Sequence, residues 1–302
     1  MPVEAVINGS EAAQAAINSL QLGSLYALFA LGVALIFGIM RLVNFAHGEF
    51  IMLGALILVY VTDWPLAAKI VVTLLGVVAI ALLSERVVFR PLRGVSPVTL
   101  LVASFALSIG LQSVALLIVG VRPQGATVSK ELNTFWQVGS VSISKLSIVT
   151  IVVTVLLLVG LVAFLSRHRV GVMMRAAAVD FTMTRLVGVR ANLVIGTAFG
   201  ISGLLAGVAA ILIVAQNGTF TVEMGLVPVL FGFIASVVGG IGSIQGAVLG
   251  GYILGGASTA LQVGLPLELK PFRDAFLFGA VLVFMVFRPG GLYIARSERT
   301  RV

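Results

Sequence analysis

Long apolar blocks, separated by short clusters of charge, make up most of this chain. Only 10% of its 302 residues are Asp, Glu, Lys or Arg, 60% are hydrophobic, and the mean hydropathy is +1.17. A soluble protein of this length needs a wetted polar surface, which this composition does not supply. The blocks approach membrane-spanning length and lack the short alternating pattern of a β-barrel. The sequence therefore predicts an all-α polytopic membrane protein, with residues 1–302 forming a single transmembrane domain.

Nine apolar blocks are candidates for transmembrane helices. The second and the last are short enough to be broken or partial spans, so the prediction is eight to nine transmembrane helices. The blocks are Ala16–Met40, Glu49–Thr62, Leu66–Ser84, Val98–Val121, Ser147–Ser166, Leu193–Ala215, Leu226–Gly242, Gly246–Gly264 and Phe272–Phe287.

Basic residues predict the orientation, because Lys and Arg collect in cytoplasmic loops. With nine spans, 13 of the 19 basic residues fall on one side, and the other side mixes its few with acids. The prediction is N-terminus out and C-terminus in. The 13 residues are Arg41, Arg86, Arg90, Arg93, Arg167, Arg169, Arg175, Arg185, Arg190, Arg288, Arg296, Arg299 and Arg301.

The longest loop on the predicted outer side runs from Arg122 to Lys145. Within it, Thr134–Ser144 alternates apolar and polar residues. Alternation of this kind favours a small exposed hairpin.

Two stretches of the chain resemble each other. Glu49–Leu58 aligns with Gln245–Leu254, each opening on an acid or amide and carrying a pair of small residues. Transporters commonly contain such repeated halves, with the substrate path at their interface. The alternative is that two apolar helices with a small-residue step match by chance.

The longest polar stretch on the basic side is Arg167–Arg190. Good helix formers fill Met173–Leu186, and Gly171 and Gly188 bracket this predicted helix. At helical spacing, Met and small residues share one face, which suits docking into the groove of a partner. The alternative is an amphipathic helix lying on lipid. The face consists of Met174, Ala177, Ala178 and Phe181, and Arg175, Asp180 and Arg185 would fix the register of docking.

Polar residues interrupt the apolar pattern between the first two blocks, in the segment Asn44-Phe-Ala-His47-Gly-Glu49. Ionisable groups near membrane depth are costly and usually face a bundle interior or a watery path. These residues, and Gln245 in the related stretch, are therefore candidates for the lining of a substrate pathway. The alternative is an ordinary wetted turn at the membrane interface.

Glycines are dense in the segment from residue 239 to residue 251. No Gly-Lys pair occurs anywhere in the chain, so this is not a phosphate-binding loop, and the chain should not hydrolyse ATP by itself. Glycines in an apolar run instead indicate close helix contact or a re-entrant turn. The predicted packing glycines are Gly239, Gly240, Gly242, Gly246 and Gly250.

Several other functions are disfavoured. The chain has no cysteine, which excludes disulfides and thiol chemistry, and no His/Glu spacing for a metal site. A serine protease inside the membrane would use Ser202 with His47 or His168, but small-residue packing explains Gly200–Gly207 better. The net charge of +8 does not indicate nucleic-acid binding, because the arginines flank apolar blocks.

Six motifs in order along nearly the whole chain resemble the "H"-type permease subunit of bacterial ABC importers for branched-chain amino acids. They are Leu22-Gly-Ser-Leu-Tyr-Ala-Leu28, Asn44-Phe-Ala-His-Gly-Glu49, Glu85-Arg-Val-Val-Phe-Arg-Pro-Leu-Arg93, Met174–Phe181 with Leu186–Val189, Gly239–Ala247, and Arg288-Pro-Gly-Gly-Leu292.

The resemblance implies a multi-pass permease of the bacterial inner membrane that binds no cofactor and is not an enzyme. Its expected partners are a second, related permease subunit, two cytoplasmic ATPase subunits that use the ATP, and a periplasmic substrate-binding protein. The family's ATPase-coupling segment matches Gly171–Val189, with Arg175, Ala178, Asp180, Phe181, Leu186 and Gly188 as its contact residues.

The resemblance fixes the transporter class better than the substrate. Related permeases for urea or short amides share these motifs, so they stay as an alternative. A stand-alone channel or secondary carrier is a second alternative, although a secondary carrier usually needs ionisable groups in mid-membrane and Glu49 is nearly alone. A non-transporting scaffold would leave the ordered motifs unexplained.

Overall fold

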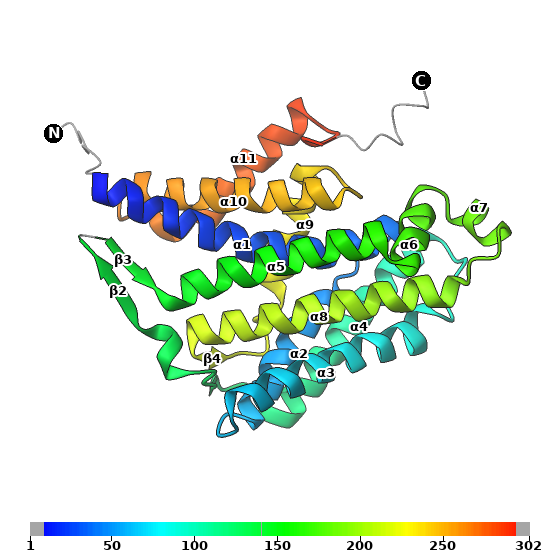
Figure 1. The fold of residues 1–302 in the computed structure, drawn as a ribbon, viewed down its shortest axis with the longest axis horizontal. Helices are drawn as coiled ribbons and strands as arrows, with labels where there is room; N and C mark the ends of the chain where they lie inside the picture. Colours follow the sequence, from blue (N-terminus) through cyan, green and yellow to red (C-terminus); the bar gives the residue numbers. More distant parts are fainter. Residues whose placement is uncertain (1–8, 140, 294–302) are drawn as a thin grey trace.

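Six long apolar helices dominate the computed structural model, which describes residues 9–139 and 141–293. Each is long and apolar enough to cross a membrane, and they lie along the long axis of the molecule (Figure 1). They are α1 (Gly9–Met40), α3 (Leu66–Ser84, continued by the π-helical turn η1, Glu85–Phe89), α4 (Pro97–Val119), α5 (Lys145–Arg167), α8 (Ala191–Asn217) and α10 (Ile244–Gly264).

Three shorter apolar helices complete the bundle: α2 (Ala46–Tyr60), α9 (Leu226–Gly239) and α11 (Arg273–Phe287). Each of the nine predicted apolar blocks is therefore helical, and the all-α prediction is confirmed. A helix of about 15 residues is shorter than the ~20 residues that span a bilayer, so helix number does not equal the number of crossings. Eight to nine transmembrane helices stays a prediction.

The two ends of the bundle differ. One end carries α6 (Arg169–Val179) and α7 (Phe181–Leu186), and the other carries two small antiparallel sheets (Figure 1). Strands β1 (Gln124–Gly125) and β4 (Thr219–Phe220) form the first sheet, and β2 (Phe135–Val138) and β3 (Val141–Ser144) form the second. The 3₁₀ turns η2 (Lys130–Asn133) and η3 (Lys270–Phe272) complete the elements.

The predicted hairpin is confirmed. Phe135 pairs with Ser144 and Val138 with Val141, which places the hairpin on the alternating stretch. The alternation of apolar and polar residues matches the two faces of a strand pair, so the pattern was readable from the sequence.

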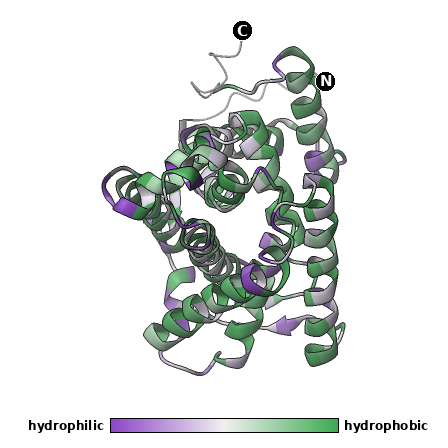
Figure 2. Ribbon diagram, turned by 90° about the vertical axis from the view of Figure 1, so that its right-hand side faces the viewer, coloured by the Kyte–Doolittle hydropathy of each residue, from purple (hydrophilic) through white to green (hydrophobic). Residues whose placement is uncertain are grey.

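Helix α1 lies at the centre of the core. It packs against α5, α8, α9 and α10, and every residue from Gly23 to Ile36 is buried. A helix that is apolar on all sides is stable only when other helices surround it, which explains this central place. The residues of the outer helices α4 and α11 are mostly exposed or half-buried, and hydrophobic residues predominate along the helices of the ribbon (Figure 2).

Helix contacts reveal an inverted repeat. Helix α1 packs on α9 and α10, and α8 packs in the same way on α2 and α3. Helix α9 contacts α10 and α11, and α2 contacts α3 and α4 in the same way. This pattern pairs α1–α4 with α8–α11. Helix α1 runs from the sheets towards α6, and α8 runs back (Figure 1), so the two units are inverted.

The repeat in the structure differs from the predicted alignment. Glu49–Leu58 lies in α2 and Gln245–Leu254 lies in α10, but the contacts pair α2 with α9. The predicted register is therefore wrong, because small residues mark close helix packing in both stretches and carry no information about topology. The short helices α2 and α9 meet at their N-terminal ends, where Gly48 faces the carbonyl of Gly225 and Gly225 faces that of Gly48.

Candidate functional site

The three polar residues predicted for a pathway lie together inside the bundle. Asn44, His47 and Glu49 are each 1% exposed. Asn44 precedes α2, and its Oδ1 accepts a hydrogen bond from the Ala46 N–H at 3.2 Å, whereas its Nδ2 has no acceptor among the described residues. The three side chains therefore lie in the bundle interior. The alternative of a wetted turn at the membrane interface is wrong.

His47 connects α2 to the central helices. Its Nδ1 lies 3.0 Å from the hydroxyl of Ser202 on α8, which also lies 3.3 Å from the carbonyl oxygen of Gly32 on α1. The imidazole fills the space beside Gly32, where any Cβ would overlap the ring. Ser202 therefore serves as a buried hydrogen-bond partner of His47, and its contacts join three helices.

Glu49 connects α2 to the outer helix α4. Its Oε1 accepts hydrogen bonds from the hydroxyl of Ser108 and from Nε2 of Gln112, both at 2.8 Å. Its Oε2 has no donor among the described residues. Ser108 and Gln112 are half-buried, whereas Glu49 itself is 1% exposed, so the carboxylate lies between α2 and α4. We call Asn44, His47, Glu49, Ser108, Gln112 and Ser202 the polar cluster.

Reasoning from the sequence missed the partners on α4. Ser104, Ser108 and Gln112 recur every four residues and form a polar stripe on a mostly apolar helix. The stripe faces α2, since Ser104 accepts from the Phe45 N–H at 3.4 Å and Ser108 donates to Glu49. This spacing is the signal that would have found them. Ser202 has no comparable signal, because it is one hydroxyl in a small-residue run.

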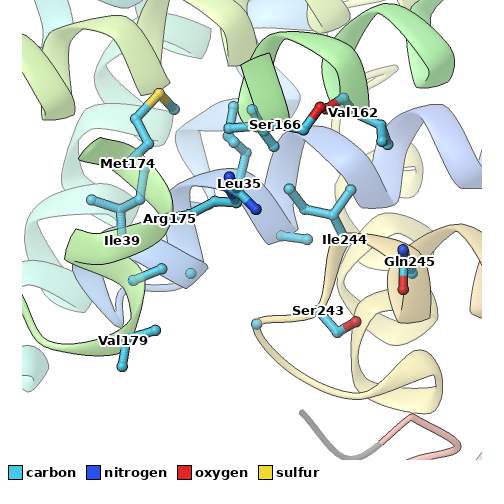
Figure 3. A pocket seen from close by; sticks show the side chains of 15 residues that line it. Leu35, Ile39, Val162, Ser166, Met174, Arg175, Val179, Ser243, Ile244 and Gln245 are labelled. Carbon is cyan, nitrogen blue, oxygen red and sulfur yellow. The ribbon is translucent and has the colours of Figure 1, made fainter. Parts of the chain in front are cut away.

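Gln245 lies apart from the polar cluster. It is exposed at the start of α10 and lines a pocket of about 430 Å³ between the ends of α1, α5, α6 and α10 (Figure 3). Arg175, Ala178 and Gly242 line the same pocket. The structure therefore joins Gln245 to residues predicted for coupling and separates it from the other predicted pathway residues.

The predicted coupling helix is two helices and not one. Asp180 has extended backbone angles (φ −146°, ψ 104°) and separates α6 from α7, and its Oδ1 accepts from the Met183 N–H at 2.9 Å. Asp is a preferred N-cap residue, so Asp180 caps the start of α7, and α6 ends at the residue before it. Gly171 lies inside α6 against Phe164, whereas Gly188, at φ 91°, follows the end of α7 as predicted.

The predicted docking face is also wrong in part. Met174 and Ala177 are buried within the chain, and Ala178 and Phe181 are half-buried. Met and small residues at helical spacing pack equally well on a neighbouring helix of the same chain, which is what they do here. Most exposed large apolar side chains of this segment lie at and around α7, and one lies earlier on α6; they are Val179, Met183, Leu186 and Val187, with Val172 earlier on α6. Arg175, Asp180 and Arg185 are exposed.

The glycines between α9 and α10 fall into two groups. Gly239 and Gly246 face each other's backbone carbonyls, and Gly250 faces the carbonyl of Ala235, so added Cβ atoms would overlap the opposite helix. Gly240 and Gly242 have φ of 111° and 85° in the intervening turn. The first group therefore permits close helix approach, and the second forms the turn.

The described residues contain no group of three or more His, Cys, Asp or Glu side chains that could hold a metal ion. The polar cluster has one acid and one imidazole with hydroxyl and amide partners. Such a set offers hydrogen bonds to a polar solute. Ser202 and His47 lie 3.0 Å apart, but among the described residues no carboxylate hydrogen-bonds the imidazole, as a Ser–His–Asp triad requires.

Comparisons with known proteins match nearly the whole chain to one family. The family model for the branched-chain amino acid transport system permease component matches residues 15–286. The high-affinity branched-chain amino acid transport system permease protein BraD of Pseudomonas aeruginosa is 35% identical, with 96% of this chain and 97% of BraD covered.

More distant relatives give the same result. The high-affinity branched-chain amino acid transport system permease protein LivH of Escherichia coli K12 is 33% identical over 94% of this chain and 96% of LivH. A probable branched-chain amino acid transport permease protein, LivH of the archaeon Methanocaldococcus jannaschii, is 26% identical over 90% of this chain and 87% of that protein. The chain belongs to the family of permease components of branched-chain amino acid transport systems.

Proposed function

We propose that the chain is the inner-membrane permease subunit of an ABC importer that carries branched-chain amino acids. The observation that carries the proposal is the full-length similarity to BraD, a high-affinity permease protein for these amino acids. The subunit would be a transport protein and not an enzyme. A second permease subunit, two ATPase subunits and a periplasmic binding protein would complete the importer.

The distribution of basic residues supports an orientation with α6 and α7 in the cytoplasm. Arg41 donates a hydrogen bond to the carbonyl oxygen of Ala178 at 3.3 Å, which joins the end of α1 to this segment. The N–H of Tyr293 donates to the carbonyl oxygen of Gly239 at 2.9 Å, so the chain after α11 returns to the turn beside the pocket. Arg41, the coupling segment and the chain just after α11 thus share one end of the bundle, as the positive-inside rule requires, whereas Arg296, Arg299 and Arg301 lie outside the described residues.

Helix α7 is the part of the coupling segment that we assign to ATPase docking. Leu186 and Val187 are 76% and 80% exposed. The segment packs on the bundle through Met174 and Ala177, and α6 contacts α1, α5 and α8. A displacement of α7 by ATP-driven closure of the ATPases would therefore reach three central helices, which is the coupling that alternating access needs.

We assign the substrate pathway to the side of the bundle where α2 meets α4. Glu49 on α2 accepts hydrogen bonds there from Ser108 and Gln112, which lie on a mostly apolar helix. Weak polar contacts and apolar walls suit an amino acid with an aliphatic side chain, because tight binding inside the membrane would slow its release. Urea or a short amide would use the same polar groups, so permeases for those solutes stay as the alternative.

Two matched variants test the docking assignment. Leu186→Asp places a charge on the exposed face of α7, and Leu267→Asp makes the same change at a leucine that is 82% exposed in the loop 265–269 between α10 and η3. We expect the first to lose the ATPase subunits on co-purification and the second to retain them. Equal retention by both variants would remove α7 from the proposed interface.

Reconstitution into liposomes tests the transporter class. The complete importer should accumulate labelled leucine only with ATP and binding protein, and the permease chain alone should not conduct leucine. Leucine flux through the chain alone would instead favour a stand-alone channel. Uptake of labelled urea or acetamide, but not leucine, by the complete importer would favour the alternative substrates.

A further inference from the structure

The pocket beside Arg175 combines an apolar wall with a positive end. Its apolar lining comes from the last turns of α1 and α5 and from α6, including Leu35, Ile39 and Val162. Its polar lining comes from Ser166, Arg175, Ser243 and Gln245. It lies where membrane helices end, so it spans the boundary between the apolar interior and the polar surface.

Arg175 is the only charged residue among those lining the pocket. Its side chain extends from α6 across the pocket towards α10 (Figure 3). Within residues 9–139 and 141–293, no acid pairs with it and no acceptor receives a hydrogen bond from its guanidinium group. Arg175 is exposed at the open side of the pocket, and a guanidinium group without a counterion beside apolar walls favours an anionic ligand.

The start of α10 adds a second positive group. Ser243 caps this helix by accepting from the Gly246 N–H at 3.0 Å. The N–H groups of Ile244 and Gln245 belong to the first turn and have no acceptor within the helix. The start of α10 therefore lines the pocket together with Arg175, and the positive end of a helix dipole favours an anion.

We infer that this pocket binds an anionic phospholipid, with the phosphate between Arg175 and the start of α10 and an acyl chain along Leu35 and Val162. A basic pocket between membrane helices suits such a headgroup. A zwitterionic lipid or an amino acid would place its cation in a lining that has no carboxylate. A small soluble anion would leave the apolar wall unused.

The lipid would join the coupling segment to the membrane-spanning helices. Arg175 and three apolar lining residues belong to α6, whereas the remaining lining residues belong to α1, α5 and the start of α10 with the turn before it. A lipid bound between them would stabilise the position of α6 against the bundle. This binding site does not depend on which solute the permease carries.

Native mass spectrometry of the full chain in detergent tests the inference. Phosphatidylglycerol and phosphatidylcholine with identical acyl chains are titrated separately, and glycerol 3-phosphate is added as a soluble competitor. Arg175→Gln removes the pocket cation, and Arg185→Gln removes an exposed arginine of α7 outside the pocket. Gly38→Leu fills the pocket from α1, and Gly160→Leu makes the same change on α5, where an added Cβ meets open space.

We expect phosphatidylglycerol to bind at least about tenfold more tightly than phosphatidylcholine, and Arg175→Gln to weaken it about fivefold to tenfold. Arg185→Gln and Gly160→Leu should leave its affinity unchanged, and Gly38→Leu should reduce it. Equal affinity for both lipids, or equal effects of the two arginine variants, would overturn the inference. Displacement of the lipid by glycerol 3-phosphate would show a site for a soluble anion instead.

Discussion

At the scale of single residues, the polar cluster is the main exception to an apolar interior. Its members are costly to bury, and most of them satisfy their hydrogen bonds through a partner on another helix. Two atoms remain without partners among the described residues, Nδ2 of Asn44 and Oε2 of Glu49. An unpartnered buried polar atom destabilises the fold, which is why the cluster suggests a function beyond packing.

Removal of the Gln112 amide should weaken the attachment of α4. Gln112→Ala loses one hydrogen bond to the buried Glu49 carboxylate and should lower the free energy of unfolding by about 1 kcal/mol, because hydrogen bonds between membrane helices contribute roughly 0.6–2 kcal/mol. Thermal unfolding of the detergent-solubilised chain measures the change.

Ser113→Ala is the matched control for Gln112→Ala. The Ser113 hydroxyl is exposed and bonds only to the carbonyl oxygen of Ile109 on its own helix, so its loss should change stability little. If both variants unfold at the same temperature, the Glu49–Gln112 hydrogen bond does not hold α4. A double-mutant cycle with Glu49→Gln should give a coupling energy well above zero.

At the scale of helices, small residues determine which pairs approach closely. Gly251 and Gly255 of α10 lie against the backbone of Ala27 and Gly23 on α1. Close backbone approach strengthens van der Waals contact, the main attraction between helices in lipid. The central helix pair thus depends on positions where no side chain fits.

Substitution of Gly251 should therefore separate α1 from α10. Gly251→Leu would overlap the Ala27 backbone, and we expect a destabilisation of about 3 kcal/mol or more with loss of folded protein. Gly256→Leu introduces the same side chain on the same helix where an added Cβ meets open space, and it should be tolerated. Size-exclusion profiles of both variants give the comparison, and equal profiles would contradict the packing argument.

The existence of the apolar helices was predictable from sequence, whereas the start of α1, at Gly9 rather than Ala16, and the helix partners were not. The lengths of the apolar blocks predict the nine helices, and the alternation of apolar and polar residues at Phe135–Val138 predicts the hairpin. The burial of Met174 was not predictable, because a face of Met and small residues suits a partner protein and a neighbouring helix equally. The helix start after Asp180 was predictable, because an Asp between two helix-forming stretches is a common N-cap signal.

At the scale of the whole molecule, the inverted repeat explains the position of the polar cluster. The N-terminal ends of α2 and α9 meet at Gly48 and Gly225, inside the bundle, and His47 and Glu49 flank this point. Short helices that begin within a membrane bundle leave non-helical backbone there, which is tolerated when protein covers it. The two repeats differ at this place, because only the first carries His47 and Glu49.

Charge and fold together predict the orientation, and single cysteines can test it because the natural chain has none. Gln137→Cys lies in β2 and Thr182→Cys lies in α7, and both side chains are exposed. A membrane-impermeant maleimide should label the first in intact cells and the second only after the inner membrane is opened. Labelling in the reverse pattern would place α7 outside and end the proposed contact with cytoplasmic ATPases.

A third position distinguishes eight crossings from nine. Arg288 follows α11, whose 15 residues span only about 22 Å as a helix. The structure ties the next residues to α9, since the Leu292 N–H donates to the carbonyl oxygen of Val238 at 2.9 Å. We therefore expect Arg288→Cys to label together with Thr182→Cys. Labelling together with Gln137→Cys would mean that α11 does not cross, and the chain would then have eight crossings or fewer.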